Sequence, residues 1–426
     1  MENLTHSLVG LLCAEVAVRS SDSLRDTRRG ERRRALDSWC RGACYAIAII
    51  GNNLPDLDFT YAKLSGPRFG YLLQHRGYTH TLPAVFAFAL VMLGAVLGLA
   101  KWRKHALSLA DCCRFAALAV LSPALHIALD FANNYGVHPF WPLNDAWFYG
   151  DCLFILEPCF WLVLVAPLLF SYRSKLTRVL LGSILALALG AIWYRPFIPP
   201  RNALLLTLIT AGLLAAARRR TPFFRMLLAS AGFVVVLGSF VLGSREAKAL
   251  VGQWARAELP TARILDIVAT PTPANPLCWS VLLVLRDDRD YFVRVGRAAV
   301  LPAWLSAGDC PYDRAAQPTA KLRQVGGNPD SRLILSQEYR IPLADLRAVV
   351  RAHCQARALL RFARVPYLAE PEADGSRVIG DLRYDRSPTL DFSDVRLGRV
   401  SAGEPEACPP YEPPWRPPRS DILSNP

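Results

Sequence analysis

The sequence predicts a mainly α protein, in which a polytopic helical membrane domain of about eight helices, some short, precedes a small α+β extracytoplasmic domain. Three observations support this prediction. Hydrophobic residues make up 52% of the 426 residues, and the mean hydropathy is positive. The apolar residues form long runs almost free of charge, all within the first 243 residues. Beyond about residue 250 no run is long enough to cross a bilayer, which takes about 20 residues.

Eight apolar stretches define the predicted helices of the membrane domain. Those that begin at residues 82, 153 and 226 come closest to the length of a bilayer span. Two others need flanking residues to reach across, and three short ones lie beside polar motifs. A soluble core helix could explain any single stretch, but the set favours a membrane domain. The stretches are residues 8–18, 43–54, 82–100, 115–129, 153–170, 179–193, 203–217 and 226–243.

Basic residues mark one side of the predicted membrane domain. The formal net charge is +14, and Lys and Arg cluster in alternate loops, such as residues 19–41 with eight arginines. The loops between them hold fewer, and residues 131–151 hold none. The positive-inside rule therefore places the basic loops in the cytoplasm, and both termini and the C-terminal domain outside. We do not expect nucleic-acid binding, because the arginines flank hydrophobic spans instead of sharing a face with aromatic residues.

Four regions follow from these patterns. Residues 1–160 carry the polar motifs described below, and residues 161–245 add further transmembrane helices. Residues 250–403 form the extracytoplasmic domain, which on this topology is periplasmic. Residues 404–426 form a proline-rich tail, expected to be extended or disordered.

Three elements are predicted within the outer domain. Residues 278–286 and 291–300 are typical of a strand hairpin, with an acidic turn at residues 287–290 between them. Residues 343–364 have apolar positions at helical spacing and predict an amphipathic helix. Residues 378–384 predict another strand.

The eleven cysteines divide by region. Seven lie in or near the membrane domain, where small buried thiols are ordinary. Cys40 and Cys44 could bind a metal, but no histidine lies near them in the sequence, so we favour buried thiols. The other four lie in the outer domain, where an even number favours disulfides, with free packed thiols as the alternative. Three pairings are open among Cys278, Cys310, Cys354 and Cys408.

Four short polar motifs occur among the apolar stretches of the first 130 residues. Imidazoles and carboxylates are the usual ligands of divalent metals of the zinc kind, and ionisable groups in apolar segments are usually functional. The predicted topology places all four motifs at the outer membrane face. We therefore predict that they hold one or more divalent metal ions, with zinc as the first candidate. The seven candidate ligands are His6, Asp56, Asp58, His75, His80, His126 and Asp130.

Each motif also has an ordinary structural explanation. His126 and Asp130 are four residues apart and share a helix face, so they could grip one ion or form a buried polar pair. Asp56 and Asp58 follow Pro55 and could be turn aspartates at the end of a helix. The segment from residue 75 to residue 80 is the most specific, because a glycine gives the backbone freedom between its two histidines.

Three residues are the candidates for catalysis. Asp58, or alternatively Asp56, would orient or deprotonate a water molecule. Arg76 offers a planar cation suited to a phosphate or carboxylate. Thr79 could orient His80 or cap the helix that follows. Seven candidate ligands exceed the four of one tetrahedral zinc, which predicts either two metals or one metal with a spare carboxylate as base.

The Asp56, His75–His80 and His126 motifs, which follow an N-terminal His6, resemble the YdjM-like, LexA-regulated, membrane-bound metal-dependent hydrolases in order and spacing. The resemblance covers about residues 1–160. It implies an inner-membrane hydrolase, and similarity of the ligand pattern to zinc phospholipase C and P1-type nucleases implies phosphoester chemistry. Family members often have Asp-Pro where this chain has Glu157-Pro158. That difference leaves open whether Glu157 contributes to the site, as is also open for His138.

The resulting hypothesis is a membrane-bound, metal-dependent hydrolase that acts on a phosphoester or lipid-linked ester at the outer face of the inner membrane. The bilayer and a lipid or phosphoester substrate are its expected partners. The first alternative is a metal transporter, which usually places its site near the bilayer midplane. The second is a scaffold with a structural metal, which would show four protein ligands and no open coordination position.

Overall fold

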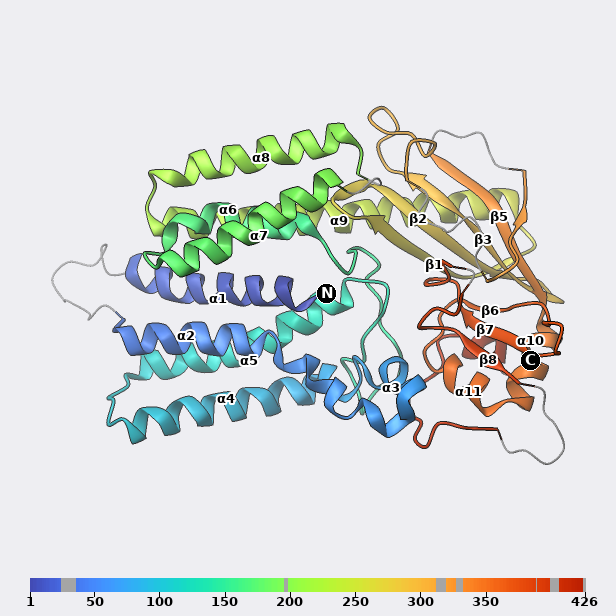
Figure 1. Cartoon of the computed structure of the whole chain (residues 1–426), viewed down its shortest axis with the longest axis horizontal. Coiled ribbons are helices and arrows are strands. Elements are labelled where there is room, and N and C mark those ends of the chain that lie inside the picture. The colour runs from blue at the N-terminus through green and yellow to red at the C-terminus, as the bar shows by residue number, and fades with distance from the viewer. Residues whose placement is uncertain are drawn as a thin grey trace.

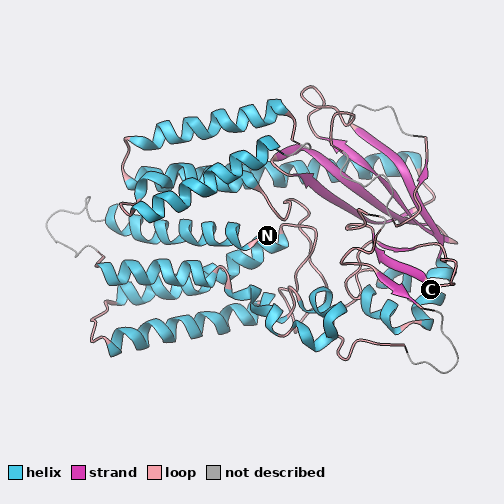
Figure 2. Ribbon diagram, in the orientation of Figure 1, coloured by secondary structure: helices cyan, strands magenta, loops and turns pink. Residues whose placement is uncertain are grey.

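The computed structural model describes residues 1–23, 36–194, 198–311, 319–326, 332–387, 389–398 and 406–423. It divides into a helical bundle and a part that contains both β-sheets (Figures 1 and 2). The bundle helices run alternately up and down, so that successive connections fall at opposite ends (Figure 1). They are α1 (Asn3–Ser23), α2 (Ser38–Gly51), α4 (Leu82–Trp102), α5 (Leu109–Phe131), α6 (Pro158–Leu168), α7 (Lys175–Tyr194), α8 (Pro200–Arg218) and α9 (Pro222–Glu258).

Five of these helices, α4, α5, α7, α8 and α9, are long and apolar enough to cross a membrane. Apart from α5, little of their most apolar segments is buried inside the protein. On α4, for example, Leu90 is 72% exposed and Val91 69% exposed. A surface of this kind is favourable in lipid and costly in water. The predicted helical membrane domain is therefore confirmed in its main character.

Two predicted helix boundaries are wrong. The apolar run at residues 153–170 does not give a bilayer-length helix, because α6 begins only at Pro158, where Glu157 caps its N-terminus. The helix that contains the apolar run at residues 226–243 does not end near the predicted domain boundary at residues 245–250. Helix α9 continues without a break to Glu258 and packs against β1 and β2. One helix therefore joins the bundle to the sheets (Figure 1).

The larger sheet is antiparallel, with strand order β1-β2-β3-β5-β4. The predicted hairpin is confirmed, since β2 pairs with β3 from Cys278 opposite Ala299 to Arg286 opposite Tyr291. Its buried residues pack with those of α6 and α9 in one continuous core. The strands are β1 (Arg263–Thr272), β2 (Asn275–Arg286), β3 (Asp290–Ala299), β4 (Arg323–Gln324) and β5 (Leu333–Pro342).

The smaller sheet consists of β6 (Pro366–Leu368), β7 (Arg377–Asp381) and β8 (Val395–Leu397), in that order. Strand β7 confirms the strand predicted at residues 378–384. The single helix predicted at residues 343–364 is wrong, because it is two helices, α10 (Leu343–Ala352) and α11 (Cys354–Leu360). They are separated by His353, whose backbone is extended.

Two disulfides join the four cysteines that lie beyond residue 250, Cys278 to Cys310 and Cys354 to Cys408. The second bond fastens the proline-rich tail to the start of α11. Residues 406–419 form neither helix nor strand, as predicted, but particular residues anchor them to the rest of the protein. Trp415 is fully buried, and its Nε1 donates a hydrogen bond to the carbonyl of Leu73 in the short helix α3 (Gly66–Gln74).

Candidate metal centre

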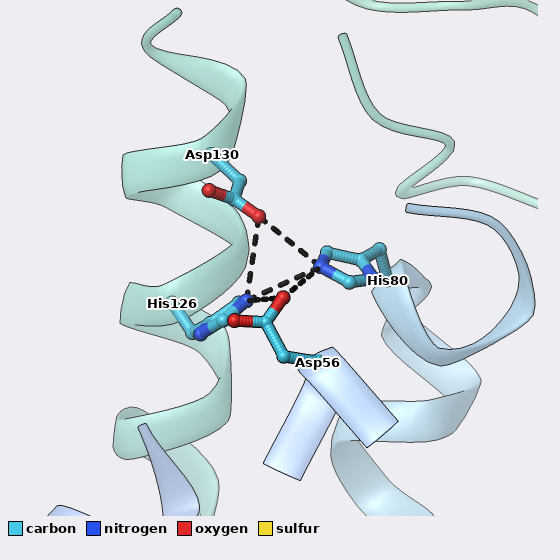
Figure 3. A group of neighbouring side chains, drawn as sticks. All are labelled: Asp56, His80, His126 and Asp130. Carbon is cyan, nitrogen blue, oxygen red and sulfur yellow. Dashed lines mark hydrogen bonds and ion pairs between the residues drawn. The ribbon is translucent and has the colours of Figure 1, made fainter. Parts of the chain in front are cut away.

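Four predicted ligands converge at the end of the bundle that faces the sheets. Asp56 lies in a 3-10 helix (Leu54–Thr60) that follows α2, and His80 ends another 3-10 turn (Tyr78–His80) just before α4. His126 and Asp130 are one turn apart on the last part of α5. Figure 3 shows the four side chains pointing toward a common centre from these three segments. One donor atom from each lies within 4.8 Å of all the others.

The distances between these donor atoms match those of a small tetrahedral ion. His80 Nε2 lies 3.2 Å from His126 Nε2 and 3.1 Å from Asp130 Oδ2. His126 Nε2 lies 3.3 Å from the same carboxylate oxygen. Asp56 Oδ1 lies 3.4 Å from His126 Nε2 and 3.7 Å from His80 Nε2. Zinc bonds of about 2.0–2.1 Å at tetrahedral angles place ligand atoms about 3.3 Å apart.

The nitrogen atoms themselves argue for a cation at this centre. The two Nε2 atoms face each other and also face two carboxylates, and all four side chains are buried or nearly so. If one of these two Nε2 atoms carries a proton, its N–H can be donated to the other nitrogen or to one carboxylate, and the remaining acceptors stay without a donor. Burial without full pairing is costly. A divalent cation would satisfy all four donors together.

Both histidines are held from behind in a way that leaves Nε2 free to ligate. His126 Nδ1 lies 2.7 Å from the carbonyl oxygen of Asn52, to which it donates. His80 Nδ1 lies 3.2 Å from Thr79 Oγ1 and 3.4 Å from Asp58 Oδ2. Hydrogen bonds of this kind fix the tautomer and the ring orientation of metal-binding histidines. Thr79 therefore contacts His80, while the cap of α4 is Thr81.

His6 lies beside the four-atom group. Its ring stacks on that of His126 with centroids 3.7 Å apart, and its Nε2 lies 3.4 Å from Asp130 Oδ1. Both ring nitrogens are buried and neither has a hydrogen-bond partner among the described residues. Orphaned nitrogens at this position fit a site that is completed by an ion.

Asp58 and His75 form a second layer behind His80. Asp58 accepts a hydrogen bond of 2.7 Å from the backbone N–H of Arg76. Its two carboxylate oxygens lie 3.2 and 3.1 Å from His75 Nδ1. Burial lowers the pKa of His75, although the Asp58 carboxylate opposes that shift. The structure thus places these two predicted ligands around the donor group and not within it.

Arg76 turns toward the site's own carboxylate. Its backbone has a positive φ of 59°, and its side chain is buried. The guanidinium lies 3.0 Å from Asp130 Oδ1 and donates at 2.7 Å to Asn133 Oδ1. The amino group of Met1 contacts the same oxygen of Asp130. Asp130 is therefore surrounded by cationic groups that stabilise its charged form.

Sequence reasoning missed some supporting residues. Asn52 lies just before the Asp56 motif, and its backbone carbonyl accepts the hydrogen bond from His126. A pattern of side chains cannot reveal a backbone contact. Asn133 follows Asp130 by three residues and was not singled out. The two open cases lie outside the centre: Glu157 caps α6 and accepts from Ala274 N, and His138 stacks on Trp415.

The ionisation state of Asp56 is consistent with a cation-binding role. Burial raises the pKa of its carboxyl group, but hydrogen bonds with His126 and His80 outweigh that effect, and the net result is a lowered pKa. Asp56 is thus held as a carboxylate, which is the form that binds metal.

Comparison with known proteins finds similarity in the N-terminal part of the chain, which carries the motifs. The protein YfhP of Bacillus subtilis (strain 168), described as uncharacterized, is 26% identical over 148 residues, 35% of this chain and 42% of YfhP. The chain thus spans less than half the length of that relative. No solved structure matches. Residues 1–199 match the YdjM inner membrane protein family. The matched part contains all seven predicted ligands.

Proposed function

We propose that this protein is a metal-dependent hydrolase of the inner membrane that cleaves a phosphoester or lipid-linked ester at the outer face. The observation that carries the proposal is the convergence of Asp56, His80, His126 and Asp130 at tetrahedral spacing. A divalent ion of the zinc kind held there would polarise the ester and lower the pKa of a water molecule to about 7.

The four ligands are not equivalent, and the difference favours catalysis. His80, His126 and Asp130 are each anchored from behind, by Asp58 and Thr79, by Asn52 and by Arg76 respectively. Two histidines and one carboxylate form a known catalytic zinc set.

Asp56 is the ligand that could exchange. Its side chain is 11% exposed, against 0–1% for the other three. Among the described residues, its carboxylate is bonded only to His80 and His126. We assign to Asp56 the position where a water molecule or the substrate would enter, with its carboxylate as the base that takes the proton of that water.

A cavity supports an amphiphilic substrate. It has a volume of about 490 Å³ and lies between the ends of α6 and α7 and the β1–β2 turn. Its walls are apolar on the bundle side, with Trp161 and Leu187. On the side of the smaller sheet they include Asp385 and Arg383, and Arg383 is paired with Asp381. Trp161 Nε1 also donates to Thr5 Oγ1, next to His6, so the cavity adjoins the segment that carries the site. Such a cavity suits a lipid chain.

The outer location is supported by two independent features. The described basic connections, at residues 101–108, 171–175 and 218–222, lie at the end of the bundle away from the metal centre and the sheets (Figure 1). Such connections prefer the cytoplasm. The part of the protein that contains the sheets carries two disulfides, which form in oxidising compartments.

A metal-binding scaffold is the second candidate, because four protein ligands can close a zinc site completely. The test begins with protein purified in detergent, for which bound metal and turnover of a panel of phosphoesters and lipid esters are measured. His80→Ala and Asp130→Ala are expected to lose both metal and turnover, while the control His353→Ala, in the sheet part, keeps both. Asp56→Asn is expected to keep metal and lose turnover. Stoichiometric metal without hydrolysis of any ester would favour the scaffold.

A topology reporter tests the location separately. Fused after Glu258, where α9 ends, it is expected to be active only outside the cytoplasm. A cytoplasmic signal would contradict the proposed orientation without affecting the metal site.

A further inference from the structure

A second group of metal-binding side chains lies at the opposite end of the bundle. Asp37 is the cap residue of α2, Cys40 lies in the first turn of that helix, and His105 lies in the connection between α4 and α5. One donor atom from each of the three lies within 4.8 Å of the others. The start of α2 and the α4–α5 connection fall at the end farthest from the sheets (Figure 1). This group is therefore remote from the centre that contains His80.

The distances within this group fit a shared cation. Cys40 Sγ lies 3.8 Å from His105 Nε2, and Asp37 Oδ2 lies 3.2 Å from the same nitrogen. With zinc bonds of about 2.3 Å to sulfur and about 2.0–2.1 Å to nitrogen and oxygen, tetrahedral angles predict about 3.6 Å and about 3.3 Å. Sulfur, nitrogen and oxygen donors together are a zinc-type set.

His105 Nε2 faces two partners at once. A single N–H can be donated to the thiol sulfur or to the carboxylate, but not well to both. The other oxygen of Asp37 is already engaged, since Oδ1 accepts a hydrogen bond of 2.8 Å from the backbone N–H of Cys40. The His105 ring is also packed against Trp39, with centroids 4.7 Å apart. The three donors are thus fixed in place around one point.

The surroundings suit a bound ion that remains in contact with solvent. Cys40 is buried in the first turn of α2. The side chains of Asp37 and His105 are 51% and 26% exposed. An ion can therefore arrive from solvent, and water can fill the fourth position.

We infer that Asp37, Cys40 and His105 form a second divalent-metal site, for a zinc-like ion, at the end of the bundle that carries the basic loops. The site would tie the α4–α5 connection to the start of α2. It shares no residue with the centre at the other end and does not depend on hydrolysis by that centre.

Cobalt separates the two sites, because only this group contains sulfur. A thiolate bound to Co²⁺ gives an intense charge-transfer band in the near ultraviolet, which nitrogen and oxygen ligands alone do not give. The full-length protein in detergent, freed of metal and titrated with Co²⁺, is expected to show this band. His126→Ala, which disrupts the other centre, is expected to keep it. The exposed Cys113 provides the matched control, and Cys113→Ser should also keep the band.

Cys40→Ser is expected to abolish the band, and His105→Ala to weaken Co²⁺ binding at this site at least tenfold. Metal content at the other centre should be unchanged in both variants, which also verifies that they fold. Absence of the band in the native protein, or its survival in Cys40→Ser, would overturn the inference. In that case the three residues form a hydrogen-bonded cluster only. Loss of esterase activity in either variant is not required by the inference.

Discussion

The Asp58→Asn substitution tests whether a residue behind the metal centre controls its affinity. Asp58 is fully buried and touches His80 Nδ1 at 3.4 Å and His75 Nδ1 at 3.1 Å. Asparagine has the same shape and can still accept the hydrogen bond from Arg76 N. The substitution therefore removes the negative charge that orients and polarises His80, and little else.

The expected size follows from the position of Asp58. Loss of a second-layer partner of a metal-binding histidine weakens metal binding about 10–100-fold, which corresponds to about 1.4–2.7 kcal/mol. Metal affinity would be measured in detergent by competition with a chromophoric chelator. The control is Asp145→Asn, a partly exposed carboxylate paired with Arg416, which should leave the affinity unchanged.

Two results would refute this reasoning. An affinity within twofold of the native protein would mean that Asp58 does not support His80. A loss as complete as that of Asp130→Ala would mean that Asp58 is itself a ligand, and that the four-atom group has been assigned one residue too few.

Two further predictions concern stability. Burial raises the pKa of Glu157 to about 7 from an ordinary 4.5, so its favourable contribution is full below pH 4.5 and lost as the pH rises through 7. Above pH 7, Glu157→Gln should therefore increase the free energy of unfolding by at most about 3 kcal/mol, which would be seen as a higher Tm. An equal increase at pH 4.5 would contradict this explanation. Arg364 is buried between Asp151 and Asp266. Arg364→Met should lower the free energy of unfolding by at most about 3–5 kcal/mol, because both carboxylates lose the guanidinium but keep a second cation, Lys248 or Arg419. Arg332→Met, which removes a partly exposed ion pair with Glu246, should lower the free energy of unfolding by less than about 1 kcal/mol in the same thermal scans. Similar losses for both variants would contradict a special contribution of the buried Arg364 pairs.

Hydropathy predicted the bundle well because lipid-facing helices must be apolar along their whole length. It failed at residues 153–157, where apolar residues continue but Glu157 and Pro158 start the helix late. It also failed beyond residue 243, where α9 becomes polar without stopping. Hydropathy reports the environment of a helix, and a helix can leave the membrane unbroken.

The sheets could be predicted only in part. The β2–β3 hairpin has two apolar runs around an acidic turn, which is a strong local signal. Strand β5, by contrast, mixes charged and apolar residues such as Glu338 and Ile341, so its partner strand and not its own pattern defines it. The break at His353 arises from the disulfide and tail contacts of Cys354, which helical periodicity cannot register.

The candidate site was largely predictable because its ligands occur in short motifs. Spacing alone could not tell which residues bind an ion directly and which support the ligands. Asp56 and Asp58 are two residues apart, yet Asp56 faces the centre and Asp58 lies behind His80. The Cys40–His105 pair could not be found at all, since 65 residues separate the two. Only the packing of α4 and α5 against α2 brings them together.

The unbroken course of α9 has a mechanical consequence. At about 1.5 Å per residue, its 37 residues extend about 55 Å, well beyond the roughly 30 Å hydrocarbon layer. The turns of α9 that extend beyond this layer pack against β1 and β2. The larger sheet is therefore attached to the bundle by a continuous helix and not by a flexible linker.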